Sequence, residues 1–198
     1  DGAGGTLGLT VCNGVTLPFK EDLRPNSAFF AAWRPLVFSR LAQAGAQALF
    51  HWDFNSSLNS GEYDDNDPPN TDKVVLSYWV DYELGHYFPY PPGAEILSIS
   101  NSDVVDVEIL PVRNPDASVV IMIVDHSVHS ATDNNGQGDP RSVMLDLSAL
   151  GTFKTATVLK IDSHTDQTSG PTATAIAITN PVAISFDGYG VAFLLLKP

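Results

Sequence analysis

The fold of this chain is decided by residues 28–54, which read AFFAAWRPLVFSRLAQAGAQALFHWDF. Apolar side chains at helical spacing predict a helix over about residues 28–44, and Gly45 is a natural stop for it. The predicted buried stripe of this helix consists of Phe29, Phe30, Trp33, Val37, Leu41 and Ala44. Pro35 lies inside the helix and is expected to kink it, because proline removes one backbone hydrogen bond. Residues 46–52 (AQALFHW) follow as a predicted buried strand.

Another strand and another helix flank this stretch. Residues 6–11 (TLGLTV) predict a short strand, and Asn26 or Ser27 can cap the helix that follows. A second helix is predicted to end before Pro89, and its apolar residues are Leu76, Trp79, Val80, Leu84 and Phe88. The order strand–helix–strand–helix is typical of a parallel α/β sheet. Because a (β/α)8 barrel needs eight such units and about 250 residues, residues 1–92 are predicted to be the end of a larger fold.

The sequence pattern changes from helical spacing to short strand-like runs at residues 89–93 (PYPPG). The prolines of this segment favour an extended linker. Seven short, strand-like runs follow: Val104–Ile109, Ser118–Val124, Ser142–Leu147, Thr155–Ile161, Ala173–Ile178, Val182–Phe186 and Val191–Leu196. Short strands separated by turn residues are typical of a β-sandwich. The predicted fold class is therefore α/β plus all-β: a partial TIM-type barrel over residues 1–92 and an antiparallel β-sandwich over residues 93–198.

Composition excludes several classes of protein. Of 198 residues, 43% are hydrophobic and 17% charged, which excludes a disordered tail and a coiled coil. The formal net charge of −13 repels phosphate backbones and anionic lipids, so neither nucleic acid nor a membrane surface is an expected partner. No apolar run approaches the roughly 20 residues of a membrane span. The single cysteine, Cys12, excludes an internal disulfide and a multi-cysteine zinc site.

The expected location is extracellular or periplasmic. Few Lys and Arg residues, with abundant Asn, Thr, Ser and Pro, are compatible with secretion. Residues 1–5 (DGAGG) have neither the basic start nor the apolar segment of a signal peptide. The chain is therefore expected to be either cytosolic or already processed.

Two predicted strand ends carry the candidate site residues. Cys12 and Asn13 follow the first strand, and His51, Trp52 and Asp53 end the second. Functional groups of α/β barrels gather at the carboxyl ends of the strands. The indole ring of Trp52 could stack on a sugar, while His51 and Asp53 could bind hydroxyl groups. Alternatively, Trp52 closes a barrel layer and His51 is a core residue.

Four blocks resemble one enzyme family. Residues 28–41, 48–54 (ALFHWDF) and 76–82 (LSYWVDY) resemble the last two βα units of clan-A retaining glycoside hydrolases, with the closest likeness to family-39-like bacterial enzymes. Residues 184–193 (ISFDGYGVAF) resemble the end of their C-terminal β-sandwich. The resemblance implies hydrolysis of O-glycosidic bonds by two carboxyl groups about 5–5.5 Å apart. It also implies that the fourth strand, which carries the acid/base Glu, lies outside this chain.

The resemblance also places Cys12 where the family has its nucleophilic Glu. Three interpretations of Cys12 remain open. Its thiolate could be the nucleophile. The site could be catalytically inactive and kept for binding sugar, with Cys12 buried and inert. Otherwise the register differs, or a carboxylate elsewhere, such as that of Glu62, takes the role.

No cofactor and no metal ion is expected. The acidic segments 61–67 and 133–139 lack the spacing of an EF-hand and are interpreted as solvated turns. His126, His129 and His164 lack the spacing of a zinc motif. The glycines of residues 2–5 precede a strand instead of following one, unlike a phosphate-binding loop.

The leading functional hypothesis is the C-terminal chain of a glycoside hydrolase. A second polypeptide would supply the other barrel strands, because an open strand edge and an uncovered aromatic helix are unfavourable in a soluble monomer. One alternative is a non-catalytic carbohydrate-binding or structural subunit derived from such an enzyme. Another is a self-sufficient adhesion protein, against which the exposed strand edge counts.

Overall fold

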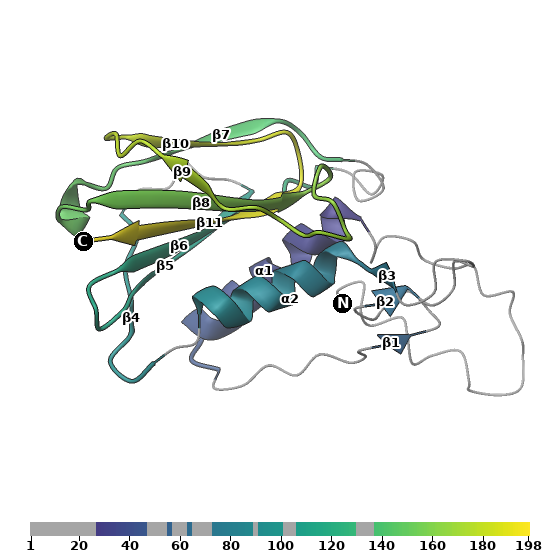
Figure 1. Ribbon diagram of the computed structural model, residues 1–198, viewed down its shortest axis with the longest axis horizontal. Coiled ribbons are helices and arrows are strands. Elements are labelled where there is room, and N and C mark those ends of the chain that lie inside the picture. The colour runs from purple at the N-terminus through teal and green to yellow at the C-terminus, as the bar shows by residue number, and fades with distance from the viewer. Residues whose placement is uncertain are drawn as a thin grey trace, which may run out of the picture.

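The computed structural model describes residues 27–46, 55–56, 63–64, 73–88, 91–100, 106–129 and 137–198. These residues form two helices lying on one face of a β-sheet, with a second, smaller sheet on its other face (Figure 1). Residues 6–11 and 47–52 of the two predicted strands lie outside the described residues. Within the described part, neither helix is long and apolar enough to cross a membrane.

The central sheet has six strands in the order β4-β5-β6-β11-β8-β9, and every neighbouring pair is antiparallel. Its strands are β4 (Glu95–Ile96), β5 (Val107–Arg113), β6 (Val119–Asp125), β8 (Thr155–Asp162), β9 (Thr174–Ile176) and β11 (Gly190–Lys197). β6 is buried at every position, and β11 is buried from Gly190 to Leu194. A strand buried on both sides indicates that both faces of the sheet are covered.

The first cover is a two-stranded antiparallel sheet, β7 (Arg141–Leu145) with β10 (Val182–Phe186). In β10 the side chains alternate strictly between buried and exposed, as expected for a strand with one face to solvent. A short 3-10 helix, Ser148–Leu150, follows β7. Side chains from both sheets form a core between them. This packing of two antiparallel sheets agrees with the predicted sandwich, which stays a prediction as a separate domain.

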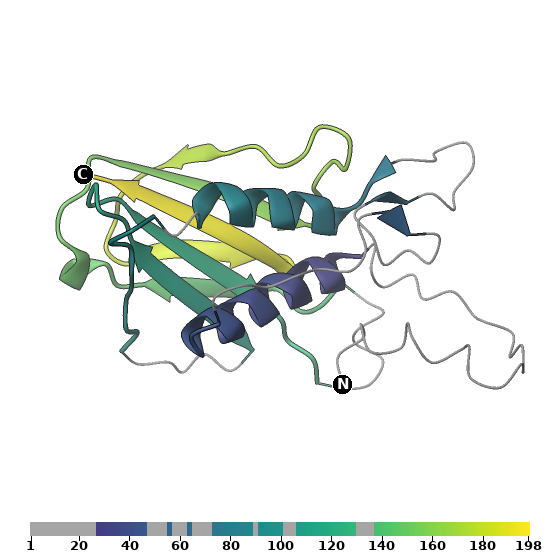
Figure 2. The ribbon, with the colours of Figure 1, turned by 90° about the horizontal axis from the view of Figure 1, so that it is seen from below.

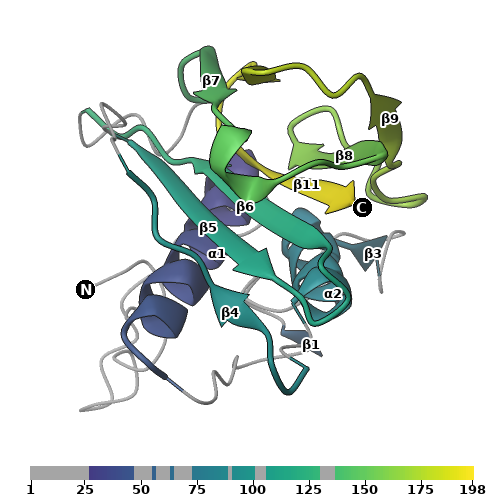
Figure 3. The same cartoon turned by 90° about the vertical axis from the view of Figure 1, so that its left-hand side faces the viewer.

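The second cover is a pair of helices, α1 (Ala28–Gln43) and α2 (Leu76–Tyr87). The end-on view places them on the face of the sheet opposite β7 (Figure 3). They lie side by side and run in the same direction across the strands (Figure 2). Successive βα units place their helices parallel to one another. This arrangement therefore agrees with the predicted strand–helix–strand–helix order, although the strands of those units lie outside the described residues.

The buried face of α1 differs from the predicted one. Small residues face the sheet, namely Ala28, Ala31, Ala32, Pro35 and Ser39. Of the predicted stripe only Phe30 is buried, whereas Leu41 is 37% exposed and Ala44 is fully on the surface. The prediction was wrong because α1 is apolar on two faces, and the face with the small residues packs against the sheet. Pro35 lies inside a helix that continues over all 16 residues.

Polar contacts fix the two helices in place. The Arg34 guanidinium of α1 pairs with the Asp81 carboxylate of α2 at 2.6 Å. On β5, the buried Glu108 carboxylate accepts hydrogen bonds from Ser39 (2.8 Å) and Gln43 (2.7 Å), and it pairs with Arg40 at 2.7 Å. α1 is thus held both to its neighbouring helix and to the sheet.

The bounds of three predicted strands need correction. The run Ser142–Leu147 is observed as β7, Arg141–Leu145. The run Val104–Ile109 is observed as β5, Val107–Arg113, which continues through Pro111. The run Ala173–Ile178 shortens to the three residues of β9.

A third sheet precedes α2 and consists of β1 (Asn55–Ser56), β2 (Tyr63–Asp64) and β3 (Lys73–Val74), with β1 and β2 parallel. The division at residues 92 and 93 stays a prediction, while α1, α2 and the six-stranded sheet share one core.

Candidate functional site

The predicted barrel site lies outside the described residues. This holds for Cys12, Asn13, His51, Trp52 and Asp53, and also for Glu62. Their roles therefore stay predictions. The described residues form two other hollows that the sequence analysis did not anticipate.

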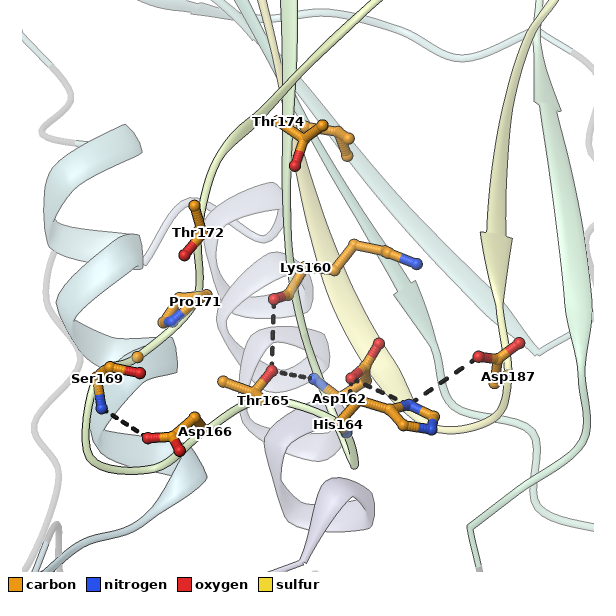
Figure 4. A pocket seen from close by; sticks show the side chains of 12 residues that line it. Lys160, Asp162, His164, Thr165, Asp166, Ser169, Pro171, Thr172, Thr174 and Asp187 are labelled. Atoms are coloured by element: carbon orange, nitrogen blue, oxygen red, sulfur yellow. Dashed lines mark hydrogen bonds and ion pairs between the residues drawn. The ribbon is translucent and has the colours of Figure 1, made fainter.

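The larger hollow has a volume of about 530 Å³ and lies beside β8 and β9 (Figure 4). The turn after β8 shapes its floor: the Asp162 carboxylate accepts a hydrogen bond from the backbone N–H of His164 at 2.8 Å. The imidazole Nδ1 of His164 lies 3.6 Å from Asp162 and 4.0 Å from Asp187. His164 and Asp187 are largely exposed, so water screens their attraction. These contacts stabilise the turn that follows β8.

The smaller hollow, the aromatic pocket, has a volume of about 220 Å³ and lies between α1 and one end of the six-stranded sheet. It is lined by Phe29, Trp33, Leu36, Asp106, His126, Val128 and Tyr189. The first three come from successive turns of α1, and the others come from the ends of β5, β6 and β11. The helix therefore forms one wall and the loops of the sheet form the other.

Ring contacts order the walls of the aromatic pocket. Phe29 meets Tyr189 edge to face, with 5.3 Å between ring centroids. Trp33 is stacked on Phe30 at 5.0 Å. Tyr189 is itself fixed, because its backbone N–H donates to the carbonyl of Gln137 at 2.7 Å. These contacts hold the aromatic side chains without a ligand.

Two polar side chains, Asp106 and His126, reach the same pocket. Asp106 adopts φ +71°, a left-handed conformation that Asp and Asn tolerate better than most residues. Its carbonyl accepts the backbone N–H of His126 at 2.9 Å. Burial lowers the pKa of the His126 imidazole, which is therefore neutral at pH 7. Its Nε2 atom is buried and has no hydrogen-bond partner among the described residues.

A buried ionic network lies behind these two residues. The Arg141 guanidinium lies 3.7 Å from Asp106 and 3.6 Å from Asp125, and it donates to the Ser127 hydroxyl at 2.7 Å. Asp125 is fully buried, and burial raises the pKa of its carboxyl despite opposing hydrogen bonds from Ser127. Asp106 is therefore positioned by Arg141, on the wall of the pocket.

No signal in the sequence identified the aromatic pocket. Its residues come from positions 29–36, 106, 126–128 and 189, so no spacing motif connects them. His126 was considered only as a zinc ligand, and Tyr189 lies in residues 184–193, which resemble the end of a glycoside hydrolase β-sandwich. Within the described ranges, no group of three or more His, Cys, Asp and Glu side chains is arranged to hold a metal ion.

Solved structures with a similar fold are glycoside hydrolases. A GH30 endoxylanase from Clostridium papyrosolvens C71 matches with a TM-score of 0.58 and 11% identity, over 91% of this chain and 40% of that one. The catalytic domain of GH30 xylanase C from Talaromyces cellulolyticus matches with a TM-score of 0.61 and 18% identity, over 87% of this chain and 35% of that one. No protein-family model and no curated protein matches the sequence.

The likeness confirms a glycoside hydrolase fold, which the sequence resemblance predicted. The two structures belong to family 30, whereas the resemblance pointed to family 39. This chain spans well under half the length of either structure. With its two helices and antiparallel sheets, the chain is thus similar in fold to a portion of these two structures.

Proposed function

We propose that this chain is the C-terminal part of a secreted glycoside hydrolase that cleaves O-glycosidic bonds. Its fold is that of part of a GH30 protein, and both solved structures are described as xylanases. Xylan is therefore the first polysaccharide to test. The remaining barrel strands would come from polypeptide outside these 198 residues, which we propose is a second chain.

The observation that carries this proposal is the second apolar face of α1. Its small residues pack on the six-stranded sheet, yet Val37 and Leu41, from the predicted stripe, remain partly exposed. A helix that is apolar on more than one face is normally buried on both. In a (β/α)8 barrel, each helix packs its inner face on the barrel strands. Barrel strands are thus a natural cover for this second face.

The proposed chemistry follows from the family resemblance. Retaining glycosidases use two carboxyl groups about 5–5.5 Å apart, one as nucleophile and one as acid/base. Cys12 would occupy the nucleophile position, and the acid/base would come from the second chain. Asn13, His51, Trp52 and Asp53 would bind the sugar through hydroxyl contacts and ring stacking.

The experiment is hydrolysis of xylan and aryl xylosides by the protein purified with its natural partner. Trp52→Ala should reduce kcat/KM by at least tenfold, because it removes the stacking platform. The matched control is Met144→Ala, since Met144 is 59% exposed on β7 and remote from both helices. Turnover that is unaffected by Trp52→Ala would contradict the proposed sugar site.

Cys12 favours a second candidate, a non-catalytic carbohydrate-binding subunit. A thiol replaces the carboxylate on which the retaining mechanism depends. In this case the purified assembly binds xylo-oligosaccharides but hydrolyses none of them. Turnover that is abolished by Cys12→Ala would exclude this candidate, whereas turnover that survives the change would assign the nucleophile to another residue.

A further inference from the structure

We propose that the aromatic pocket binds a single sugar ring, as an accessory carbohydrate site separate from the barrel site. The choice of carbohydrate as the ligand class rests on the proposed function. The pocket itself rests on the geometry of the described residues. Its aromatic walls and its two polar groups come from elements that are fixed by their own contacts.

The aromatic wall supplies the apolar half of such a site. Phe29 and Trp33 are four residues apart on α1 and therefore lie on the same side of the helix. Tyr189 faces them from the start of β11 and contacts Phe29 edge to face. A sugar ring presents C–H groups on its faces, and these pack on aromatic rings as other apolar groups do. The wall is therefore suited to the face of a pyranose ring.

The polar half comes from Asp106 and His126. A sugar ring presents hydroxyl groups around its edge, and a carboxylate accepts hydrogen bonds from them. A neutral imidazole can donate one hydrogen bond and accept another. The buried Nε2 atom of His126 lacks a partner among the described residues, and a buried polar atom without a partner is costly. Because this atom is shielded from solvent, a bound hydroxyl group would satisfy it once the imidazole turns toward the pocket.

Size and charge narrow the ligand class. The volume of about 220 Å³ is below the roughly 300–1,000 Å³ of sites for drug-sized ligands, so one ring fits and an oligosaccharide does not. The Asp106 carboxylate on the wall disfavours an anion. Val128, which is 46% exposed, lies where the pocket opens. The rest of a longer sugar chain would leave the pocket past Val128.

The three tryptophans of the chain allow the site to be tested directly. Trp33 lines the aromatic pocket, Trp52 belongs to the predicted barrel site, and Trp79 of α2 donates its indole N–H to the carbonyl of Gln167 at 2.8 Å. The protein, purified with its partner and labelled with 15N-indole tryptophan, is titrated with xylose, glucose and xylotriose. Each indole N–H signal is assigned by a Trp→Phe variant.

Saturable movement of the Trp33 signal at millimolar sugar is the expected result, with the Trp79 signal unmoved. Val128→Trp fills the opening and should abolish that movement, whereas Met144→Trp places the same side chain at an exposed apolar position elsewhere and should not. Asp106→Asn keeps a residue that tolerates the left-handed backbone and should weaken binding about tenfold.

The outcomes separate this inference from the proposed function. A Trp33 signal that stays unmoved by every sugar, or that moves equally in Val128→Trp and Asp106→Asn, overturns the accessory site. If the Trp52 signal alone moves, the barrel site is supported and the accessory site is rejected. If the Trp33 signal alone moves, the accessory site is supported and sugar binding at the barrel site is contradicted.

Discussion

The two faces of the six-stranded sheet are covered in different ways. Strands β7 and β10 cover one face with aliphatic side chains, and they keep their own outer face in solvent. Helices α1 and α2 cover the other face, where aromatic rings pack among aliphatic side chains: Tyr87 stacks on Phe193 at 5.2 Å, and Phe88 lies 6.1 Å from the same ring. The difference teaches that the helical segment is part of the core of the sheet. It also leaves Val37 and Leu41 of α1 partly exposed.

The largest effect is expected from Phe193→Ala on the helix side. Phe193 is fully buried beneath α2, and Phe→Ala in a core typically costs about 3–5 kcal/mol. The neighbouring Leu194 points to the opposite face and is equally buried, so Leu194→Ala should cost about 2–5 kcal/mol. Urea unfolding followed by circular dichroism measures both values. A loss below about 1 kcal/mol for Phe193→Ala alone would mean that the helices are loosely docked.

Loss of the polar contacts between α1 and β5 is expected to have the second-largest effect on the free energy of unfolding. Glu108→Ala removes an acceptor that serves Ser39, Gln43 and Arg40, and the loss of hydrogen bonds to a buried charge costs about 2 kcal/mol. Glu95→Ala, at an exposed position of β4, is the matched control. Equal stability of the two variants would show that the network does not hold the helix.

Two glycines near α2 should respond in opposite directions. Gly170 has φ +74°, and a Cβ atom there would lie 2.7 Å from the Trp79 ring, so Gly170→Ala should cost about 1–2 kcal/mol. Gly85 lies inside α2 with open space around its Cα, so Gly85→Ala should stabilise by about 0.5–1 kcal/mol. Thermal unfolding reports both changes. If Gly170→Ala stabilises the protein instead, the loop that contains Gly170 does not pack closely against Trp79 of α2.

The smallest expected effect is a change in how the free energy of unfolding depends on pH. Because burial lowers the pKa of His126 in the folded chain, the unfolded chain binds a proton first as the pH falls below about 6.5. His126 therefore contributes a decrease in the free energy of unfolding as the pH falls from about 7 to 5, and His126→Gln should remove that contribution. The exposed His164 supplies the control, His164→Gln. An unchanged pH slope in His126→Gln would contradict the burial of the imidazole.

Much of the fold follows from local sequence. Strand β10 was predicted with its observed bounds, Val182–Phe186, because its alternation matches a half-exposed strand. Helices α1 and α2 were predicted from their spacing and from their stops near Gly45 and Pro89. The buried face of α1 was not predicted correctly. The helix is apolar on two faces, and its sequence pattern does not indicate which of them packs against the sheet.

The described pockets could not be predicted, for a different physical reason. Glu108 is buried because Ser39 and Gln43, at least 65 residues away in the sequence, donate to it. Asp106 and Tyr189 meet Trp33 only once the sheet has formed. Contacts of this kind depend on tertiary packing and leave no local spacing to detect. The predicted barrel residues, by contrast, came from strand ends and stay predictions.

The most direct test of the central claim is the mass of the native assembly. We propose that barrel strands from outside these residues cover the second apolar face of α1, so native mass spectrometry of the protein from its natural source should give a folded species heavier than 21.2 kDa. Denaturing the same sample should then release a second polypeptide. A folded, monomeric species of 21.2 kDa would contradict the account.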